Sequence, residues 1–243
     1  MKAGYLRSFW IMILSCVYMA ATCGRAIIKA LRGSITRQWC NEELQRWAMR
    51  MLRLFKIHCT VINPHHVTPN LGKAVILMCN HTSLLDIPLS LQAFPNHPVR
   101  MLAKKELSRI PIMGGGMIAA EFPFIDRRNR KQAIQDLSLV KSLLESGIVM
   151  WIAPEGTRSV TGALQPFKQG GFITAIKTGA TIIPIGIRGA NRILPAHSYQ
   201  FHLEQHAEVH VGKPIDASTY DLKDKKQLIE RVYQAINDLT KRW

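Results

Sequence analysis

AVILMCNHTSLLD, residues 74–86, is the stretch of the chain that decides the fold. Its first half, from Ala74 to Cys79, is an uninterrupted apolar run with the length and composition of a buried strand. Its second half places His81 and Asp86 five residues apart, directly after that run. Loops at the ends of strands carry much of the chemistry of α/β folds, so both side chains are candidate site residues. Five residues turn a helix through about 500°, so the pair can meet only if His81 lies just outside a helix and Asp86 in its first turns.

An imidazole within hydrogen-bond reach of a carboxylate can act as a general base. The carboxylate fixes the tautomer of the ring and stabilises the imidazolium that forms. The spacing alone is weak evidence, because a surface histidine followed by an aspartate at the start of a helix has the same pattern. A second block, WIAPEGTRS at residues 151–159, strengthens the interpretation, since it also follows an apolar strand-like run, residues 147–151.

Four motifs in order resemble the glycerolipid acyltransferase family, and in particular the bacterial 1-acyl-glycerol-3-phosphate acyltransferases. They are the block that holds His81 and Asp86, residues 124–127, residues 151–159, and the proline-centred run 182–185. Shorter segments in family-like order bring the resemblance to about residues 57–215, and four ordered motifs are far more specific than one.

The resemblance implies transfer of an acyl chain from acyl-CoA or acyl carrier protein to the sn-2 hydroxyl of 1-acyl-glycerol-3-phosphate. His81 would be the general base and Asp86 its orienting partner. No Gly-x-Ser-x-Gly elbow is present, so a nucleophilic serine is not expected. Ser83 is better explained as a residue of a helix start.

The expected acceptor-binding residues are cations, a glycine, a hydroxyl and one carboxylate. Arg158 can hold two phosphate oxygens in its planar fork, Gly156 allows close approach of the backbone, and Thr157 adds a hydroxyl. The resemblance assigns Glu155, Gly156, Arg158 and Arg127 to the acceptor site. A carboxylate would repel phosphate, so Glu155 is expected to contact the acceptor hydroxyl or orient the arginine. Lys104 is a further candidate, with Lys105 as the alternative.

The bulk composition indicates a folded protein with an anionic partner. The chain has 243 residues, 47% of them hydrophobic and 20% charged, which argues against disorder. Its net charge of +16 suggests nucleic acid, an anionic membrane or an acidic protein. No nucleic-acid recognition element is visible, so an anionic membrane surface is the favoured partner. Five cysteines without paired spacing predict reduced thiols in a protein that faces the cytosol.

The first 56 residues are predicted to form two membrane-associating helices, over 5–31 and 38–56. Residues 9–23 are apolar over about fifteen positions, short of the roughly 20 that a spanning helix needs. A cleavable signal peptide is the alternative, but an enzyme that uses cytosolic thioesters would be stranded by export. The helix over 38–56 is amphipathic and basic, which is typical of an interfacial element, although its apolar face could simply pack on the domain. These features predict the inner membrane, with the active site facing the cytoplasm.

Residues 57–243 are predicted to form a single α/β acyltransferase domain with a largely parallel, possibly mixed sheet flanked by helices. Strands are expected near 57–62, 74–79, 99–103, 122–125, 147–152, 181–187 and 201–211, and helices over 83–93, 112–120, 130–146, 170–178 and 224–240. The glycines at 114–116 indicate close helix packing or a flexible lid. Pro184 indicates an edge strand or a bend that shapes an acyl channel.

Other functions remain open on the sequence alone. The acceptor could be glycerol-3-phosphate or a lyso-aminolipid, because the same catalytic pair would serve all three. A membrane-binding module without catalysis is less favoured, since it gives His81 and Asp86 no role. His202, His206 and His210 recur every four residues, but the intervening residues alternate as in a half-exposed strand, so neither a metal nor a cofactor is expected.

Overall fold

The computed structural model describes residues 2–70, 72–126 and 130–241. Its helices are α1 (Tyr5–Leu31), α2 (Arg37–Leu54), α3 (Asp86–Ser90), α4 (Met113–Ala119), α5 (Arg130–Glu145), α6 (Gly170–Thr178), α7 (Ala190–Ile193) and α8 (Lys225–Thr240), with 3-10 turns η1 (Lys105–Arg109), η2 (Ala217–Thr219) and η3 (Leu222–Asp224). Its strands are β1 (His58–Ile62), β2 (Val75–Cys79), β3 (Val99–Met101), β4 (Ala103–Lys104), β5 (Phe124–Ile125), β6 (Val149–Ile152), β7 (Thr181–Arg188), β8 (His206–Val211) and β9 (Ile215–Asp216).

The main sheet has the strand order β1-β8-β7-β2-β6-β3, with β9 paired to β7. The neighbours of β2 and β6 run parallel to them, whereas β8 and β9 pair antiparallel to β7. The predicted α/β fold with a largely parallel, mixed sheet is therefore confirmed. β2 lies between β7 and β6 and is buried at every position, so its carboxyl end, which leads to His81, opens near the centre of the sheet.

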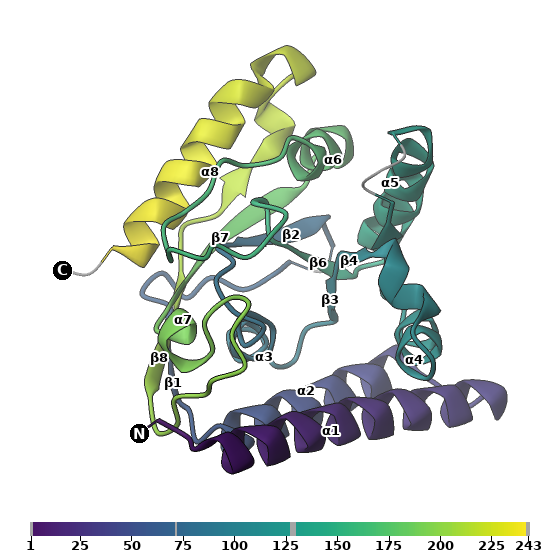
Figure 1. Ribbon diagram of the computed structural model, residues 1–243. Coiled ribbons are helices and arrows are strands. Elements are labelled where there is room, and N and C mark those ends of the chain that lie inside the picture. Colours follow the sequence, from purple (N-terminus) through teal and green to yellow (C-terminus); the bar gives the residue numbers. More distant parts are fainter. Residues whose placement is uncertain (1, 71, 127–129, 242–243) are drawn as a thin grey trace.

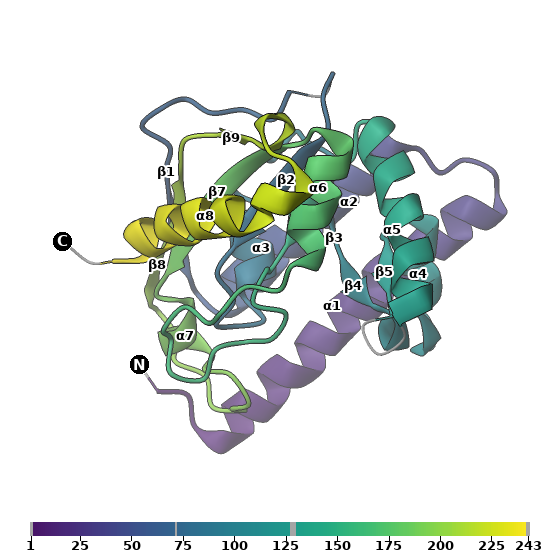
Figure 2. The same ribbon diagram turned by 90° about the horizontal axis from the view of Figure 1, so that it is seen from above.

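Helices cover both faces of the sheet, as Figures 1 and 2 show. The alternation of side chains along β2 divides the core in two. Val75, Leu77 and Cys79 pack into one cluster with residues of α2 and α3. Ile76 and Met78 point to the opposite face and pack into the other cluster, with residues of α6 and α8.

The N-terminal helices lie side by side along one flank of the molecule, beneath α3 and against α4 (Figure 1). The apolar face of α2, which includes Trp47, Met51 and Phe55, is buried in the core, so the alternative in which this face packs on the domain is the one observed. In α1 the apolar side chains turned outward are exposed instead, among them Leu6 and Trp10. By length and composition α1 is long and apolar enough to cross a membrane.

Two sets of contacts, one at the buried Arg100 and one at the partly exposed Arg37, fix this helical layer to the sheet. The guanidinium of Arg100, on β3, donates to the carbonyl of Ala120 at 2.5 Å and to Oδ1 of Asn41 on α2 at 2.9 Å. Arg37, at the start of α2, pairs with Glu121 at 2.6 Å. These contacts hold α2 and the end of α4 in place relative to β3.

Two of the three glycines of α4, Gly114 and Gly116, provide the close packing that was one of the two expectations. A Cβ atom at Gly114 would lie 2.0 Å from the carbonyl oxygen of Ser108, and one at Gly116 would lie 2.4 Å from Cβ of Cys23 on α1. Gly116 therefore lets α4 approach the backbone of α1 more closely than any other residue would allow.

Two local expectations differ from the structure. The helix expected over 83–93 is regular only over Asp86–Ser90, with turns after it. Pro184 lies inside β7, between β2 and β8, and not on an edge. It is tolerated there because it falls between the segments of β7 that pair with β8 and with β9, where the ladder needs no amide from it. It does not line the cavity described below.

Candidate active site

His81 and Asp86 meet at the carboxyl end of β2. Nδ1 of His81 lies 2.9 Å from Oδ2 of Asp86, and the aspartate side chain is fully buried while the histidine ring is 16% exposed. His81 lies in the loop before α3 and Asp86 is the first residue of that helix. The predicted arrangement, with the histidine just outside a helix that the aspartate begins, is the one observed.

The backbone around Asp86 fixes the tautomer of His81. Oδ2 of Asp86 also accepts the amide N–H groups of Thr82 and Ser83, at 2.7 and 2.8 Å. Because two amide donors already converge on this oxygen, it serves as an acceptor, and we therefore assign the proton of the shared contact to Nδ1 of the histidine. Because the ring of His81 also lines a cavity, Nε2 is left as the nitrogen that can take a proton from a ligand.

A second set of contacts fixes the position of the His81 ring relative to Asp86. The edge of the Trp151 indole, on β6, packs against the His81 ring with centroids 5.8 Å apart and planes at 83°. The indole N–H donates to the hydroxyl of Ser90 at 2.9 Å, and that hydroxyl donates to the carbonyl of Asp86 at 2.6 Å. The contacts form a closed ring through α3 and β6, so a displacement of either side chain of the pair would break at least one of them.

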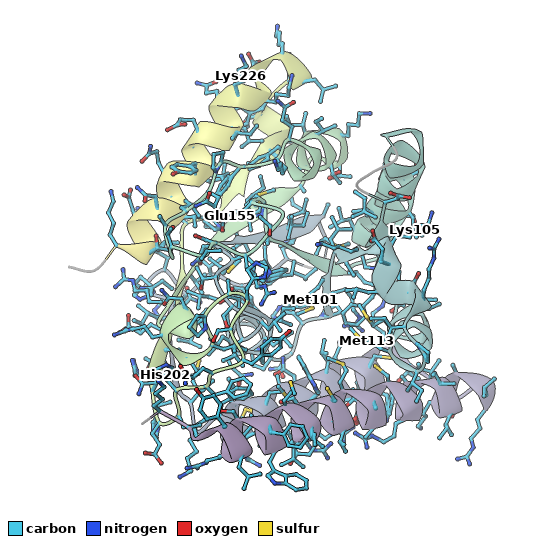
Figure 3. All side chains as sticks on the ribbon, viewed as in Figure 1. Met101, Lys105, Met113, Glu155, His202 and Lys226 are labelled. Atoms are coloured by element: carbon cyan, nitrogen blue, oxygen red, sulfur yellow. The ribbon has the colours of Figure 1, made fainter. Side chains whose placement is uncertain are left out.

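The main chain of His81 is bound by the loop that follows β6. Its amide donates to Oε1 of Glu155 at 2.6 Å, and its carbonyl accepts the amide of Ser159 at 2.7 Å. The other oxygen of Glu155 accepts the amide of Gln165 at 2.8 Å. Glu155 is 2% exposed and lies within the body of the molecule (Figure 3). Burial raises the pKa of this carboxyl, while the two amide contacts act in the opposite direction.

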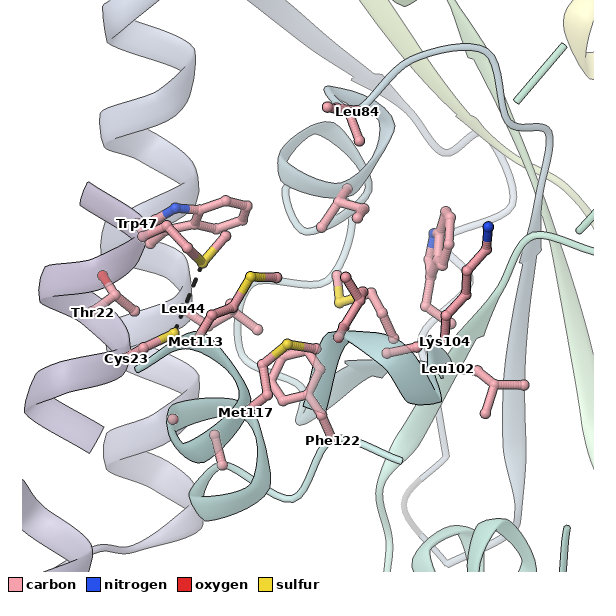
Figure 4. Close-up of a pocket in the computed structure, with 18 of the residues that line it drawn as sticks. Thr22, Cys23, Leu44, Trp47, Leu84, Leu102, Lys104, Met113, Met117 and Phe122 are labelled. Carbon is pink, nitrogen blue, oxygen red and sulfur yellow. Dashed lines mark hydrogen bonds between the residues drawn. The ribbon is translucent and has the colours of Figure 1, made fainter. Parts of the chain in front are cut away.

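A cavity of about 470 Å³ opens beside His81 and extends to the N-terminal helices. Most of its wall is apolar, and Figure 4 shows Met113, Met117, Phe122 and Trp47 turned toward it. The wall is contributed by α1, α2, η1 and α4 on one side, and by α3, β3, β4, β6 and the loops after β2 and β6 on the other. An apolar cavity with a few polar groups at one end has the composition of a site for an amphipathic molecule.

Four of the expected acceptor-binding residues line this cavity together with His81: Lys104, Gly156, Thr157 and Arg158. Lys105 does not line it, and its ammonium lies 4.0 Å from the carboxylate of Asp126. Of the two lysines that the sequence left open, Lys104 is therefore the one that faces the site. Glu155 is adjacent but is engaged with backbone amides. Arg127 lies outside the described residues.

Neither a cysteine nucleophile nor a metal cluster accompanies this pair in the described part of the chain. Cys79, next to the motif, is fully buried, and burial raises the pKa of its thiol well above the usual range, so the thiolate is disfavoured. Among the residues that the structure describes, no group of three or more potential metal ligands is found. His206 and His210 lie on β8 with Glu208 between them, and the residues that alternate with them are buried, as expected for a half-exposed strand.

Sequence reasoning missed the supports of the site and much of the cavity wall. Ser90 has no signal of its own, because a serine four residues after Asp86 is ordinary helix composition. In the sequence, Trp151 stands out only as the first residue of the block 151–159. His197, which also lines the cavity, comes from a distant loop. The one signal in the sequence for a ring packed on the His81 imidazole is the tryptophan at the end of the predicted strand 147–152.

Comparisons with known proteins show which proteins this chain is similar to. A family model described as Acyltransferase matches residues 58–188, more than half of the chain. A 1-acyl-sn-glycerol-3-phosphate acyltransferase of Brassica napus is 29% identical over 176 residues, which are 72% of this chain and 50% of that protein. An uncharacterized acyltransferase of Schizosaccharomyces pombe is 33% identical over 170 residues, 68% of this chain and 60% of that protein. The chain thus spans about half to 60% of the length of these relatives.

The fold has a close counterpart among solved structures. The crystal structure of the 1-acyl-sn-glycerophosphate acyltransferase PlsC from Thermotoga maritima superposes with a TM-score of 0.77 and covers 98% of this chain and 96% of its own. Its sequence is 23% identical, so the likeness is one of fold. The N-terminal helices are part of the region that superposes, because the match covers almost the whole chain.

Proposed function

Because the chain belongs to the Acyltransferase family, we propose that it transfers an acyl chain from a thioester to the sn-2 hydroxyl of 1-acyl-glycerol-3-phosphate and so forms phosphatidic acid. The observation that carries this proposal is the contact between Nδ1 of His81 and Oδ2 of Asp86, 2.9 Å long, at the edge of an apolar cavity. The names of the relatives, which are 1-acyl-sn-glycerol-3-phosphate acyltransferases in several organisms, support the acceptor.

In the proposed reaction, Nε2 of His81 takes the proton of the acceptor hydroxyl as its oxygen attacks the thioester carbonyl. Asp86 stabilises the imidazolium that forms. The tetrahedral intermediate then collapses: the new carbon–oxygen bond stays, the carbon–sulfur bond breaks, and the imidazolium returns its proton to the leaving thiolate. General base catalysis of this kind supplies about 10²–10⁴-fold in rate. The donor is acyl-CoA or acyl carrier protein, whose thioesters are chemically equivalent at the reacting carbon.

The acceptor phosphate is proposed to lie against Arg158 and Thr157, with Lys104 on the other side of the opening and Gly156 allowing close approach. Arg127, outside the described residues, remains a proposed member of this group. The acyl chain of the acceptor or donor would occupy the apolar part of the cavity, because most of the cavity wall is apolar.

We further propose that residues 1–56 associate with the anionic face of the inner membrane and that residues 57–243 carry the chemistry on its cytoplasmic side. The exposed apolar face of α1 and the net charge of +16 support this arrangement. A lysophospholipid acceptor resides in such a membrane, so the enzyme would meet it there.

The test is an assay of membrane fractions with labelled acyl-CoA or acyl carrier protein as donor. Lysophosphatidic acid is offered alone and then in competition with glycerol-3-phosphate and a lyso-aminolipid. We expect product from lysophosphatidic acid and a loss of at least about 10²-fold in kcat for His81→Ala, with the fold retained. His65→Ala, in an exposed loop, is the matched control. Product formed only from another acceptor would overturn the proposed acceptor, and appreciable turnover by His81→Ala would remove the base.

A further inference from the structure

Both carboxylate oxygens of Glu155 are occupied by the protein itself. Oε1 accepts the amide of His81 at 2.6 Å and Oε2 the amide of Gln165 at 2.8 Å, with the residue 2% exposed. A buried amide that loses its acceptor costs about 1–3 kcal/mol. Each oxygen could accept a further hydrogen bond, but Glu155 is buried and does not line the cavity, so a ligand there would not reach it. The observed geometry therefore favours a role within the protein.

The loop after β6 holds His81 at both of its main-chain polar groups. The amide of His81 binds Glu155, and its carbonyl accepts the amide of Ser159 at 2.7 Å. The same loop carries Thr157 and Arg158, which line the cavity. The imidazole is bound separately, by Asp86. The loop that presents the cations to the cavity is therefore the one that fixes the position of the histidine.

We propose that Glu155 is a positioning residue, whose carboxylate ties the main chain of His81 to the loop that carries Arg158 and so sets the distance between base and acceptor. This inference rests on the proposed function, because it assigns His81 the role of base. It differs from direct binding of the acceptor, since Glu155 acts through His81 and not on the ligand.

The chemistry of the side chain explains why a glutamate stands here. Two N–H donors must be accepted by one side chain, and a carboxylate has two acceptor oxygens whereas a glutamine amide has one. Burial raises the pKa of Glu155 in the folded protein. Ionising this carboxyl therefore costs stability, and the cost grows as pH rises from the ordinary pKa of a glutamate toward the raised one. A residue retained at such a cost is better explained by the position it enforces than by stability.

The kinetic test compares Glu155→Gln and Glu155→Asp with wild type while lysophosphatidic acid is varied. In Glu155→Gln, the side-chain NH2 group would face one of the two backbone N–H groups, so two donors would oppose each other. In Glu155→Asp, the side chain is shorter by one methylene and cannot reach both N–H groups. Misplacement of a catalytic group by about 1 Å can cost 10²-fold, so we expect kcat to fall about 10- to 100-fold with the acceptor KM changed less than about threefold. Glu145→Gln, an exposed glutamate on α5, is the matched control and should match wild type. A raised KM with unchanged kcat, or no change in either, would overturn the proposal.

A second readout does not depend on the substrate. Hydrogen exchange of the His81 amide should be slow in wild type and in Glu145→Gln, and at least about tenfold faster in both Glu155 variants, because the acceptor of that amide is weakened. Equal exchange rates of the His81 amide in all proteins would overturn the positioning role of Glu155, even if the variants were inactive. If wild type makes no product from lysophosphatidic acid while the exchange rates differ as expected, the proposed function fails, but the contact by which Glu155 holds the main chain of His81 is supported. Circular dichroism identifies a variant that does not fold, in which case the other Glu155 variant decides.

Discussion

Arg158 is the residue whose chemical identity matters most for the choice of acceptor. It lines the cavity with His81 and follows Glu155 on a loop that backbone hydrogen bonds hold at both ends. A guanidinium can bind two oxygens of a phosphate in one plane, whereas an ammonium is a point charge. Under the proposed function, we therefore expect this position to discriminate a phosphorylated acceptor from one without phosphate.

We expect Arg158→Lys to raise the KM for lysophosphatidic acid about tenfold, with a smaller effect on kcat. Losing one charge-assisted hydrogen bond of about 1.5–3 kcal/mol corresponds to at least this factor. Steady-state kinetics with the acceptor varied measures the change. Arg231→Lys, on the distant helix α8, should leave KM unaltered. An unchanged KM in Arg158→Lys would assign this arginine a purely structural role.

At the scale of elements, the contact between α1 and α4 decides the shape of the cavity. Both helices contribute to its wall, and Gly116 brings them together at the position of Cys23. The neighbouring Gly115 meets only the flexible end of the Ile27 side chain, at 3.2 Å. The two glycines thus differ in what an added methyl group would encounter, although both lie in the same turn of the same helix.

We expect Gly116→Ala to lower the free energy of unfolding by about 1–3 kcal/mol, because the methyl group would overlap backbone atoms of α1 and push the helices apart. Gly115→Ala should change it by less than about 1 kcal/mol or raise it, since the Ile27 side chain can move and alanine favours the helix. Urea denaturation of both variants measures the difference. Equal unfolding free energies would mean that α4 shifts along α1 without loss of packing.

The molecule as a whole presents an apolar side and a basic surface charge. The outward face of α1 exposes Leu6 at 73% and Trp10 at 55%, and no other described helix exposes so many large apolar side chains. The net charge is +16. Exposed apolar side chains on one helix, together with an overall excess of basic residues, support the proposed association with an anionic membrane.

We expect Leu6→Glu to weaken binding to vesicles of anionic phospholipid at least about fivefold, since it places a charge where an apolar side chain would enter the lipid. Leu139→Glu is the matched control, because Leu139 is 53% exposed but lies on α5. Co-sedimentation with vesicles measures the bound fraction. Identical losses in the two variants would show that the effect is one of charge and not of position.

The sequence predicted the centre of this molecule better than its periphery. The run from Val75 to Cys79 and the His81–Asp86 spacing follow local rules, namely a buried strand and a histidine just outside a helix start, so they could be read directly. The roles of Ser90 and Trp151 could not, because they depend on the pairing of β2 with β6, a long-range contact that no local pattern encodes. The amide contacts of Glu155 were hidden for the same reason: its partners are 74 and 10 residues away.

The two sides of α1 have different neighbours, and this constrains how its sequence can vary. Met19, Cys23 and Ala26 face the cavity, while Val17 and Ile28 face outward. Under the proposed function, a substitution on the inner side would alter the volume offered to an acyl chain, and one on the outer side would alter attachment to lipid. A single insertion in the helix would rotate every following residue by about 100° relative to the preceding ones and so turn the inner residues away from the cavity. Selection on α1 should therefore tolerate point changes on either side far more readily than any change in its length before Ala26.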